Sequence, residues 1–427
     1  MIRAINKQEV FLVAYTELKN FYYGDEKEYA KEYLNRFDSE NAVKIDFCIG
    51  ENQAFFIRNV DVMTLAFEIA TLDKKVGILC NNLPGIAKTQ YSKKCLIDEI
   101  VITNKIEGVH SSRQEISDAL DILETQSIAK GKRNRFTGLV NKYLKLVTSE
   151  TIPLNSSRDI RDIYNEIFLD EVVFEDPNNR PDGKLFRKNS VSVYSETGKA
   201  IHTGLLPEAK IIEAMEQALR FLNDNSVIEL FRICIFHYFI GYIHPFYDGN
   251  GRLGRFLFSY GISKSLTPLI SFRISETIKE NIKQYYKAFA QCNDPRNCGD
   301  ITPFLLMQLR MIHLAMVDLE KSLNEKRSMW MKYEKIIINY CNSDISLRQL
   351  YSYLIQAAMF GEVGITMQEL QKNIKISSYL IKKLMTKIPK ELIVIRKKSN
   401  YKFYSLDLKK LDSLSFQESL NEVISGG

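Results

Sequence analysis

The hydrophobic and polar positions along the chain predict a mainly α-helical protein. Up to about residue 325, apolar residues recur at spacings of three and four, the period of an amphipathic helix. The first 90 residues are expected to form a helical N-terminal region with one strand at AVKIDFCI. Further helices are predicted over residues 92–106, 113–126, 158–172, 207–223, 226–243, 250–264, 275–292 and 301–325.

One segment, residues 186–203, departs from the helical pattern. SVSVY alternates between polar and apolar residues, SETGK supplies turn residues, and AIHTG leads out of the turn. This order is typical of a short β-hairpin, which we expect to project from the helical body.

The pattern changes again after about residue 330. Thr366 and Glu369 have the spacing of a capping box and open a predicted helix. A second helix is predicted from Ser378, followed by strands at LIVIRK and YKFYSLD. A helix-turn-helix followed by a hairpin is the winged-helix pattern. We therefore expect a helical core over 91–325 and a winged-helix-like α+β domain over 330–427. The last core helix could cross the boundary near 326–332 without a break.

Composition describes an ordinary soluble chain. Of the 427 residues, 45% are hydrophobic and 26% are charged, and the net charge is +6, too small by itself to indicate nucleic-acid binding. The seven cysteines form no Cys-x-x-Cys pair, which favours reduced thiols. The most apolar stretch contains Arg232 and is too short to span a membrane. A cytoplasmic protein without membrane association is expected.

The segment HPFYDGNGRLGR, residues 244–255, concentrates the candidate chemistry. The preceding apolar helix must end near Pro245, and a new helix begins near Asn250. Gly249 and Gly251 allow successive backbone amides to converge at the helix N-terminus, where the helix dipole also favours an anion. Arg252 and Arg255, three residues apart, can reach the same anion. The pattern predicts a cradle for more than one phosphate.

Two further residues complete this constellation. His244 has a side chain suited to removing a proton from a hydroxyl near neutral pH. Asp248 offers the hard oxygen ligand that Mg²⁺ on a nucleotide requires. Taken singly, Asp248 could be a helix N-cap and His244 could merely close a helix, while the arginines could form surface ion pairs. Their coincidence in one loop favours transfer of a phosphorus-centred group to a hydroxyl.

The segment resembles the signature His-x-Phe-x-Asp/Glu-Gly-Asn-Gly-Arg-x-x-Arg of the Fic (filamentation induced by cAMP) family at every fixed position. The resemblance covers roughly residues 90–325 and implies a Fic-type helical bundle that transfers AMP from ATP to a protein hydroxyl. It implies that His244 is the base and that Asp248 holds Mg²⁺. It also assigns phosphate binding to Gly249, Asn250, Gly251 and Arg252, the γ-phosphate to Arg255, and a packing role under the loop to Phe246.

The resemblance extends to two other segments. Residues 186–203 resemble the family's flap, which aligns a target protein by strand pairing. YYKAFAQCND resembles the family's paired-tyrosine helix, so Tyr286 and Asn293 would bind adenine. The alternative for Tyr286 is an ordinary core aromatic.

A second stretch, TNKIEGVHSSRQE, resembles the family's inhibitory motif Ser/Thr-x-x-x-Glu-Gly/Asn through Thr103, Glu107 and Gly108. The helix over about 92–108 seems set to end at Gly108, which leaves Glu107 in a last turn where the helix dipole disfavours an anion. The resemblance implies that Glu107 pairs with Arg255 and blocks productive ATP binding. The alternative is a surface glutamate at a frayed helix end.

The predicted winged helix carries basic residues on its second helix and hairpin. They could follow DNA phosphates, but winged helices also bind proteins, and protein interaction is the preferred interpretation. The residues are Lys382, Lys383, Lys387, Arg396, Lys397, Lys398 and Lys402.

The resulting hypothesis is an autoinhibited protein adenylyltransferase with ATP as substrate, Mg²⁺ as cofactor and a hydroxyl-bearing target protein as partner. Two alternatives stay open: an enzyme that removes AMP, with Glu107 positioning a water, and a DNA-binding regulator whose core senses a nucleotide. The family often dimerises, so a homo-oligomer is also possible.

Overall fold

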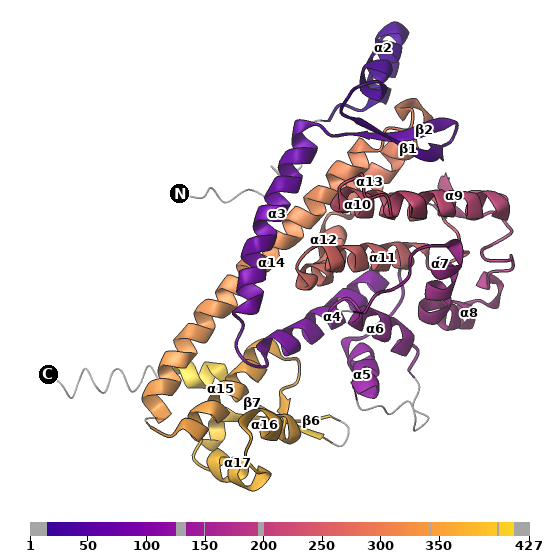
Figure 1. The fold of residues 1–427 in the computed structure, drawn as a ribbon. Coiled ribbons are helices and arrows are strands. Elements are labelled where there is room, and N and C mark those ends of the chain that lie inside the picture. The colour runs from indigo at the N-terminus through magenta and orange to yellow at the C-terminus, as the bar shows by residue number, and fades with distance from the viewer. Residues whose placement is uncertain are drawn as a thin grey trace. The chain divides into compact units, whose positions relative to one another are not determined.

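The structure is a computed structural model that describes residues 15–124, 134–148, 150–194, 200–341, 343–398 and 401–413. Helices dominate it, as predicted, and the strands form small antiparallel sheets (Figure 1). No helix in these ranges combines the length and apolar character that crossing a membrane requires.

The chain divides into two compact units. One comprises Met1–Lys74 and Leu96–Asp318, and the other comprises Lys75–Cys95 and Leu319–Gly427. These limits differ from the predicted ones at 90 and 325–330. Helix α3 (Val60–Asn81), α4 (Ala87–Ile106) and α14 (Thr302–Cys341) each contribute residues to both units.

Helix α10 (Glu229–Ile243) is the centre of the first unit. Its sequence is apolar on all sides, which is typical of a helix buried all round, and nearly all its side chains are buried. It packs against α9 (Glu208–Leu222) and α11 (Asn250–Ser265). Further helices of this unit are α5 (Arg113–Glu124), α6 (Thr137–Leu144), α7 (Ser157–Tyr164), α8 (Asp170–Glu175), α12 (Ile274–Glu280) and α13 (Ile282–Asn293).

Three predicted helices differ in detail. The helix predicted over 158–172 is interrupted by a π-helical turn at Asn165–Leu169, which separates α7 from α8 because it breaks the 3.6-residue repeat. The helix predicted over 275–292 is divided at Asn281, whose side-chain Nδ2 donates back to the Thr277 carbonyl at 2.9 Å. The helix predicted over 301–325 continues to Cys341.

The N-terminal region is less helical than predicted. Strand β1 (Ala42–Ile49) coincides with the predicted AVKIDFCI, but it pairs with an unpredicted strand, β2 (Asn52–Ile57). The β2 residues are buried at three successive positions, so they lack the alternation that would have indicated a strand. Two helices, α1 (Leu18–Tyr22) and α2 (Glu26–Phe37), precede the hairpin, whereas residues 1–14 lie outside the described ranges.

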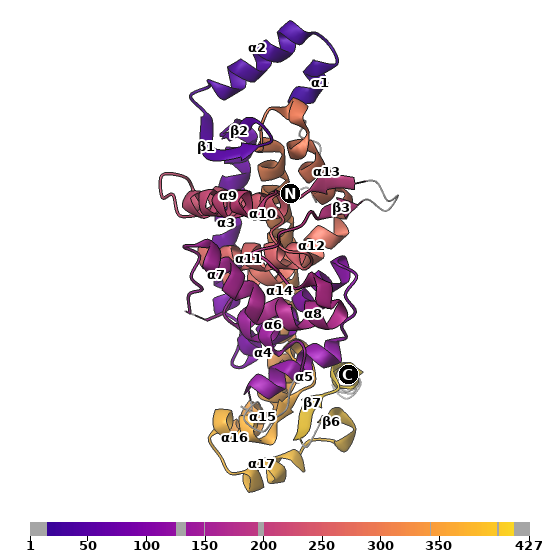
Figure 2. The ribbon, with the colours of Figure 1, turned by 90° about the vertical axis from the view of Figure 1, so that its right-hand side faces the viewer.

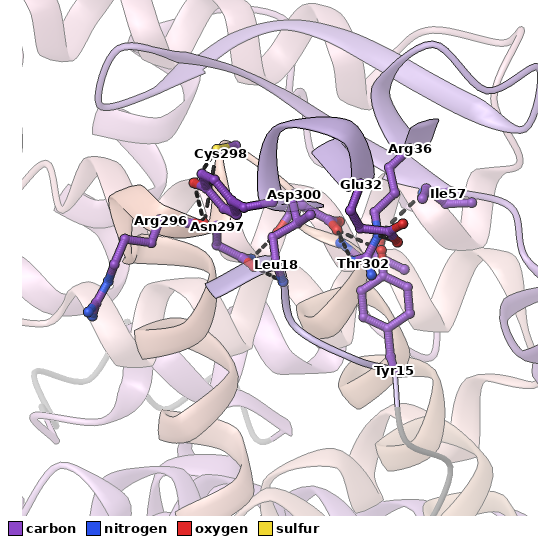
Figure 3. Close-up of polar contacts among 11 residues, drawn as sticks. Tyr15, Leu18, Glu32, Arg36, Ile57, Arg296, Asn297, Cys298, Asp300 and Thr302 are labelled. Atoms are coloured by element: carbon purple, nitrogen blue, oxygen red, sulfur yellow. Dashed lines mark hydrogen bonds and ion pairs between the residues drawn. The ribbon is translucent and has the colours of Figure 1, made fainter. Parts of the chain in front are cut away.

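A buried carboxylate fastens this region to the loop between α13 and α14 (Figure 3). Asp300 accepts hydrogen bonds from the Tyr15 hydroxyl at 2.6 Å and the Thr302 amide at 2.9 Å. Arg36 lies 3.4 Å away and also pairs with Glu32. Both oxygens of the Asp300 carboxylate therefore have partners, although the side chain is fully buried.

The predicted flap is present as two short strands. β3 (Ser192–Tyr194) pairs antiparallel with β4 (Ala200–Thr203), with Ser192 opposite Thr203. The turn residues 195–199 lie outside the described ranges.

The C-terminal elements follow the predicted order. After α15 (Ile345–Phe360) come α16 (Met367–Ile374) and α17 (Ser378–Met385), and the predicted hairpin is β6 (Ile393–Lys398) with β7 (Tyr401–Leu406). The capping box is present, because the Glu369 amide donates to the Thr366 hydroxyl and the Glu369 carboxylate accepts from the Thr366 amide. A short unpredicted strand, β5 (Ile365–Thr366), completes a sheet of order β5-β7-β6, of which Figure 2 labels β6 and β7.

Candidate active site

The signature segment forms a tight loop between α10 and α11. His244 ends α10 in the left-handed region, with φ 52° and ψ 61°, and Gly249 precedes α11 with φ 80°. The side chain of Asn250 closes the loop: its Oδ1 accepts the Phe246 amide at 2.9 Å and its Nδ2 donates to the Phe246 carbonyl at 2.8 Å. The contribution left for Asn250 to a phosphate is therefore its backbone amide, in the first turn of a helix.

Phe246 anchors the loop from below. Its ring is fully buried and stacks on Tyr164 with ring centroids 3.6 Å apart. The Tyr164 hydroxyl donates to the Asp248 carbonyl at 3.1 Å. The π-helical turn that follows Tyr164 thus lies next to the loop, and α7 fixes the loop from a part of the chain about 80 residues earlier.

Arg252 is buried with only part of its donor set used. It is 1% exposed, and its Nη1 donates to Glu171 of α8 at 3.0 Å. Its Nε and Nη2, and the Oε1 of Glu171, have no hydrogen-bond partner among the described residues. Burial raises the pKa of Glu171, opposed by Arg252. Buried guanidinium donors are normally paired, so two unpaired donors fit an anion that the chain itself does not supply.

Arg255 differs from Arg252, because all three of its guanidinium nitrogens are paired, with Thr103 of α4 and with Glu107 just after that helix. Nε donates to the Thr103 hydroxyl at 2.8 Å, Nη2 to the Thr103 carbonyl at 3.1 Å and Nη1 to Glu107 at 2.8 Å. Arg255 is 1% exposed, whereas the Glu107 side chain is 28% exposed. The contact predicted for the inhibitory motif is therefore present in the structure.

Glu107 lies directly over the first turn of α11. A Cβ atom at Gly251 would collide with the Glu107 carboxylate. Glu107 follows the end of α4 at Ile106, and Gly108 turns the chain away with φ 73°. The carboxylate thus neutralises Arg255 and occupies the helix N-terminus where a phosphate is predicted to bind.

His244 is held neutral by its surroundings. Burial lowers the pKa of His244 to about 4, helped by His202 and Arg187, while Glu107 and a hydrogen bond with the Gly241 backbone act in the other direction. At neutral pH an imidazole of this kind can accept a proton, which is the state that a general base requires.

The flap and α13 meet at the side of this loop. His202 of β4 contacts the Tyr242 carbonyl at 2.7 Å through Nε2 and Asn293 Nδ2 at 3.3 Å through Nδ1. Asn293 Oδ1 accepts the Tyr238 hydroxyl at 2.8 Å. Tyr286 is 42% exposed and so is not an ordinary core aromatic, whereas its neighbour Tyr285 is buried and contacts His237.

Asp248 is not the N-cap of α11, a position that Gly249 takes. Its Oδ1 accepts the Gly249 amide at 2.6 Å. Among the described residues no group of three or more His, Cys, Asp or Glu side chains could hold a metal. Mg²⁺ is commonly held by one or two carboxylates together with substrate phosphates, and a single Asp248 fits that kind of site.

Three contributors were missed from the sequence. Glu171 pairs with Arg252, Arg187 binds the His244 carbonyl, and Glu99 on α4 accepts the Ser275 amide at 3.0 Å and hydroxyl at 2.6 Å. Burial raises the pKa of Glu99 to about 7. Only Glu99 carried a signal, since it stands four and eight residues before Thr103 and Glu107, on one helical face.

Comparisons with known proteins match this region. Residues 154–261 match the Fic/DOC family profile. "Protein adenylyltransferase Fic" from Drosophila mojavensis is 27% identical over 257 residues, which are 58% of this chain and 46% of that protein. The protein of the same name from Drosophila grimshawi is 26% identical over 204 residues, covering 46% of this chain and 38% of its own length.

Among solved structures, that of a Fic family protein from Desulfovibrio desulfuricans G20 is similar with a TM-score of 0.46 and 18% identity, covering 80% of this chain and 96% of that one. The matched profile contains the flap and the entire signature loop, so this region of the chain is similar to the Fic/DOC family. The chain spans less than half the length of the curated relatives it matches. Glu107, Tyr286 and Asn293 lie outside the profile match.

Proposed function

We propose that this chain is an autoinhibited protein adenylyltransferase that transfers AMP from ATP to a Tyr, Thr or Ser hydroxyl of a target protein. The observation that carries the proposal is Arg252, a buried guanidinium with two unpartnered donors in the loop that a neutral His244 opens. The relatives named protein adenylyltransferase support the same reaction.

The reaction follows from the positions of these groups. ATP would place its phosphates at the amides of Asn250 and Gly251 and at Arg252, and its adenine beside Tyr286 and Asn293. The target hydroxyl attacks the α-phosphorus, its proton passes to the His244 ring, and the bond to the bridging oxygen breaks to release pyrophosphate. The edge of β3 or β4 would hold the target's backbone as an added strand, which requires no particular target sequence.

Mg²⁺ would be held by Asp248 together with the phosphates. When bound, it neutralises phosphate charge and orients the leaving group. Asp248 is already fixed by its hydrogen bond from the Gly249 amide, and its backbone carbonyl is fixed by Tyr164.

The inhibition is supported by the contacts of Arg255. A γ-phosphate cannot use this guanidinium while Thr103 and Glu107 hold its three nitrogens. The Glu107 carboxylate also stands over Gly251, where it would repel a phosphate. Displacing Glu107 would therefore free both the arginine and the helix N-terminus.

The test is incubation with [α-³²P]ATP and a cell lysate, using wild type, Glu107→Gly, His244→Ala and the double variant. We expect protein-bound label to increase with Glu107→Gly and to fall by at least about 100-fold in both variants that lack His244. Thermal melting checks that each variant is folded. Label that persists without His244, or that is unchanged in Glu107→Gly, would contradict the proposal.

The same labelled proteins test the opposite direction of reaction. Proteins labelled by Glu107→Gly are freed of nucleotide and incubated with wild type or Glu107→Gln. If wild type removes AMP and Glu107→Gln does not, the chain is the AMP-removing enzyme in which Glu107 positions a water. We expect no removal, because Glu107 is engaged with Arg255.

A second function, binding of duplex DNA by the C-terminal segment, is favoured by the charge distribution. Residues 365–413 contain twelve Lys and Arg and four Asp and Glu, a net charge of +8, whereas the whole chain carries +6. Lys397 of β6 stands directly opposite Lys402 of β7, and such like-charge pairs destabilise a hairpin. Lysine on an edge strand resists aggregation, but this does not explain Lys402, because β7 is the central strand of its sheet. On α17, Lys382 and Lys383 are exposed.

Fluorescence anisotropy of a labelled DNA duplex against the full chain separates DNA binding from protein binding. We expect affinity to fall steeply with salt and to be weakened by Lys383→Glu and Lys402→Glu, but not by Lys27→Glu on the exposed face of α2. Absence of salt-dependent binding would leave protein interaction, the interpretation preferred from the sequence.

A further inference from the structure

Arg187 is a buried cation that binds only main-chain carbonyls. It is fully buried, and its Nε donates to the His244 carbonyl at 2.9 Å, its Nη1 to Asn189 at 2.6 Å and its Nη2 to Leu205 at 3.0 Å. Burial lowers its pKa. None of these three acceptors carries a negative charge, so the free-energy cost of burying the Arg187 guanidinium is only partly offset.

The three acceptors belong to three different parts of the site. Asn189 leads into β3, Leu205 leads out of β4, and His244 is the first residue of the signature loop. Two backbone hydrogen bonds reinforce the junction: the Arg187 amide donates to the Pro245 carbonyl at 3.2 Å, and the Leu205 amide donates to the Ile243 carbonyl at 3.2 Å. One guanidinium thus joins both arms of the flap to the backbone of His244.

The junction has no spare room. A Cβ atom at Gly204 would collide with Arg187 Nη2 and would lie 2.8 Å from His244 Cβ. His244 itself is in the left-handed region, which is strained for a residue other than glycine. A strained residue keeps its conformation only where its surroundings over-determine it, and the planar fork of Arg187 supplies one such restraint on the His244 carbonyl.

We propose that Arg187 is a positioning residue for the transfer reaction, which sets the imidazole of His244 relative to the flap edge that presents the target hydroxyl. The inference rests on the function proposed above. It gives the flap a second role besides holding the target, because the residues at its two ends fix the position of His244, the proposed general base. A displacement of about 1 Å between reacting groups can cost roughly 100-fold in rate, so this junction controls catalysis without contacting the nucleotide.

Arg187 also acts on His244 through its charge. The groups that influence the His244 ring are His202 and Arg187 from the flap, the Gly241 backbone from α10 and Glu107 from α4. A positive charge disfavours the protonated ring. Neutralising Arg187 therefore raises the pKa of His244 toward its ordinary value, and the acidic limb of the rate profile moves to higher pH.

The experiment uses self-labelling with [α-³²P]ATP in the full chain carrying Glu107→Gly, followed from pH 4.5 to 8. Arg187→Lys keeps the charge but loses the planar fork, whereas Arg187→Gln loses both. We expect kcat to fall roughly 10- to 100-fold in each, with the KM for ATP unchanged. The pH at which the labelling rate falls on the acidic side should move upward only in Arg187→Gln. Lys184→Gln, an exposed residue before the flap that also loses one charge, is the matched control and should change neither kcat nor the acidic limb.

The outcomes distinguish this inference from the proposed function. If the Glu107→Gly parent itself shows no label that depends on His244, the proposed function fails and this inference fails with it. If the parent labels and Arg187→Gln retains its rate and its acidic limb, only the inference is overturned. If both Arg187 variants fail to fold, Arg187 serves stability alone, and the inference is likewise overturned. Partial recovery of Arg187→Gln with added guanidinium would support it.

Discussion

Two arginine–carboxylate clusters in the first compact unit differ in how completely their polar atoms are paired. Around Asp300, both carboxylate oxygens have donors, and Arg36 divides its nitrogens between Asp300 and Glu32. Around Arg252, two guanidinium nitrogens and one oxygen of Glu171 are buried without partners among the described residues. Buried polar atoms are rarely left unpaired in a cluster that serves stability alone.

We infer that the difference separates a structural cluster from the proposed phosphate-binding site. The Asp300 cluster fastens α1, α2 and β2 to the loop before α14, and none of its buried side-chain atoms is without a partner among the described residues (Figure 3). The proposed nucleotide phosphate would supply the acceptors that Arg252 Nε and Nη2 lack among the described residues. Arg255 lies between these cases: its nitrogens are paired with Thr103 and Glu107, and we propose that these partners can be displaced.

The largest expected effect is on the stability of the Asp300 cluster. Asp300→Ala leaves Arg36 and the Thr302 amide without their buried acceptor, so we expect a loss of about 3–5 kcal/mol in the free energy of unfolding. Labelling measured well below the unfolding transition should be unchanged. Urea denaturation followed by circular dichroism measures the free energy of unfolding. Equal losses of stability and labelling would contradict a purely structural role for the Asp300 cluster.

The next effect concerns Arg252. In the Glu107→Gly background, Arg252→Gln removes the donors available to a phosphate, and we expect labelling to fall by about 100-fold, the usual loss for one preorganised electrostatic donor. The melting temperature should also fall, because Glu171 loses its buried partner, but less than in Asp300→Ala, since Arg252 Nε and Nη2 have no partner to lose. A nearly normal rate together with severe destabilisation would reverse the roles of the two clusters.

A smaller effect is expected at Thr103. Thr103→Val preserves shape but removes the hydroxyl that accepts from Arg255 Nε. One hydrogen bond to a charged group contributes about 1.5–3 kcal/mol, so partial release should raise labelling by roughly 10-fold while Glu107 remains in place. Titrating ATP in wild type and Thr103→Val measures this, and unchanged ATP dependence would show that the Thr103 hydroxyl does not restrain Arg255.

The smallest effect is a pH dependence of stability at Glu99. Its pKa in the folded chain, about 7, is above that of an exposed glutamate, so folding takes up a proton between these values. The stability it contributes is complete at low pH and is lost as pH rises through 7. Glu99→Gln should therefore raise the melting temperature by a few degrees, roughly 2–6 °C, at pH 8 and much less at pH 5. An equal shift at both pH values would contradict this assignment.

The signature loop and the contact of Arg255 with Glu107 could be predicted because their residues stand in fixed sequence patterns. Short-range rules were reliable for the same reason, and the predicted capping box at Thr366 is present. Glu171 and Arg187 could not be predicted. The position of Glu171 depends on a π-helical turn, and that of Arg187 depends on a junction of three separate segments. Neither feature produces a periodic pattern in the sequence.

The hydrophobic pattern predicted where helices occur more accurately than the residues at which they begin and end. α14 continues past the predicted boundary because the segment after residue 325 is equally compatible with a helix. β2 was missed because three successive buried residues give no alternation. The predicted turn of the flap, residues 195–199, lies outside the described ranges and stays a prediction.

The bare Cα of Gly251 has a consequence for genetic screens. Any side chain there would strike the Glu107 carboxylate, so a substitution would dislodge the restraint. It would also obstruct the first turn of α11, where the donor nucleotide is proposed to bind. Selections for unrestrained, toxic alleles should therefore recover changes at Glu107 or Thr103 but not at Gly251, where loss of control and loss of catalysis arise together.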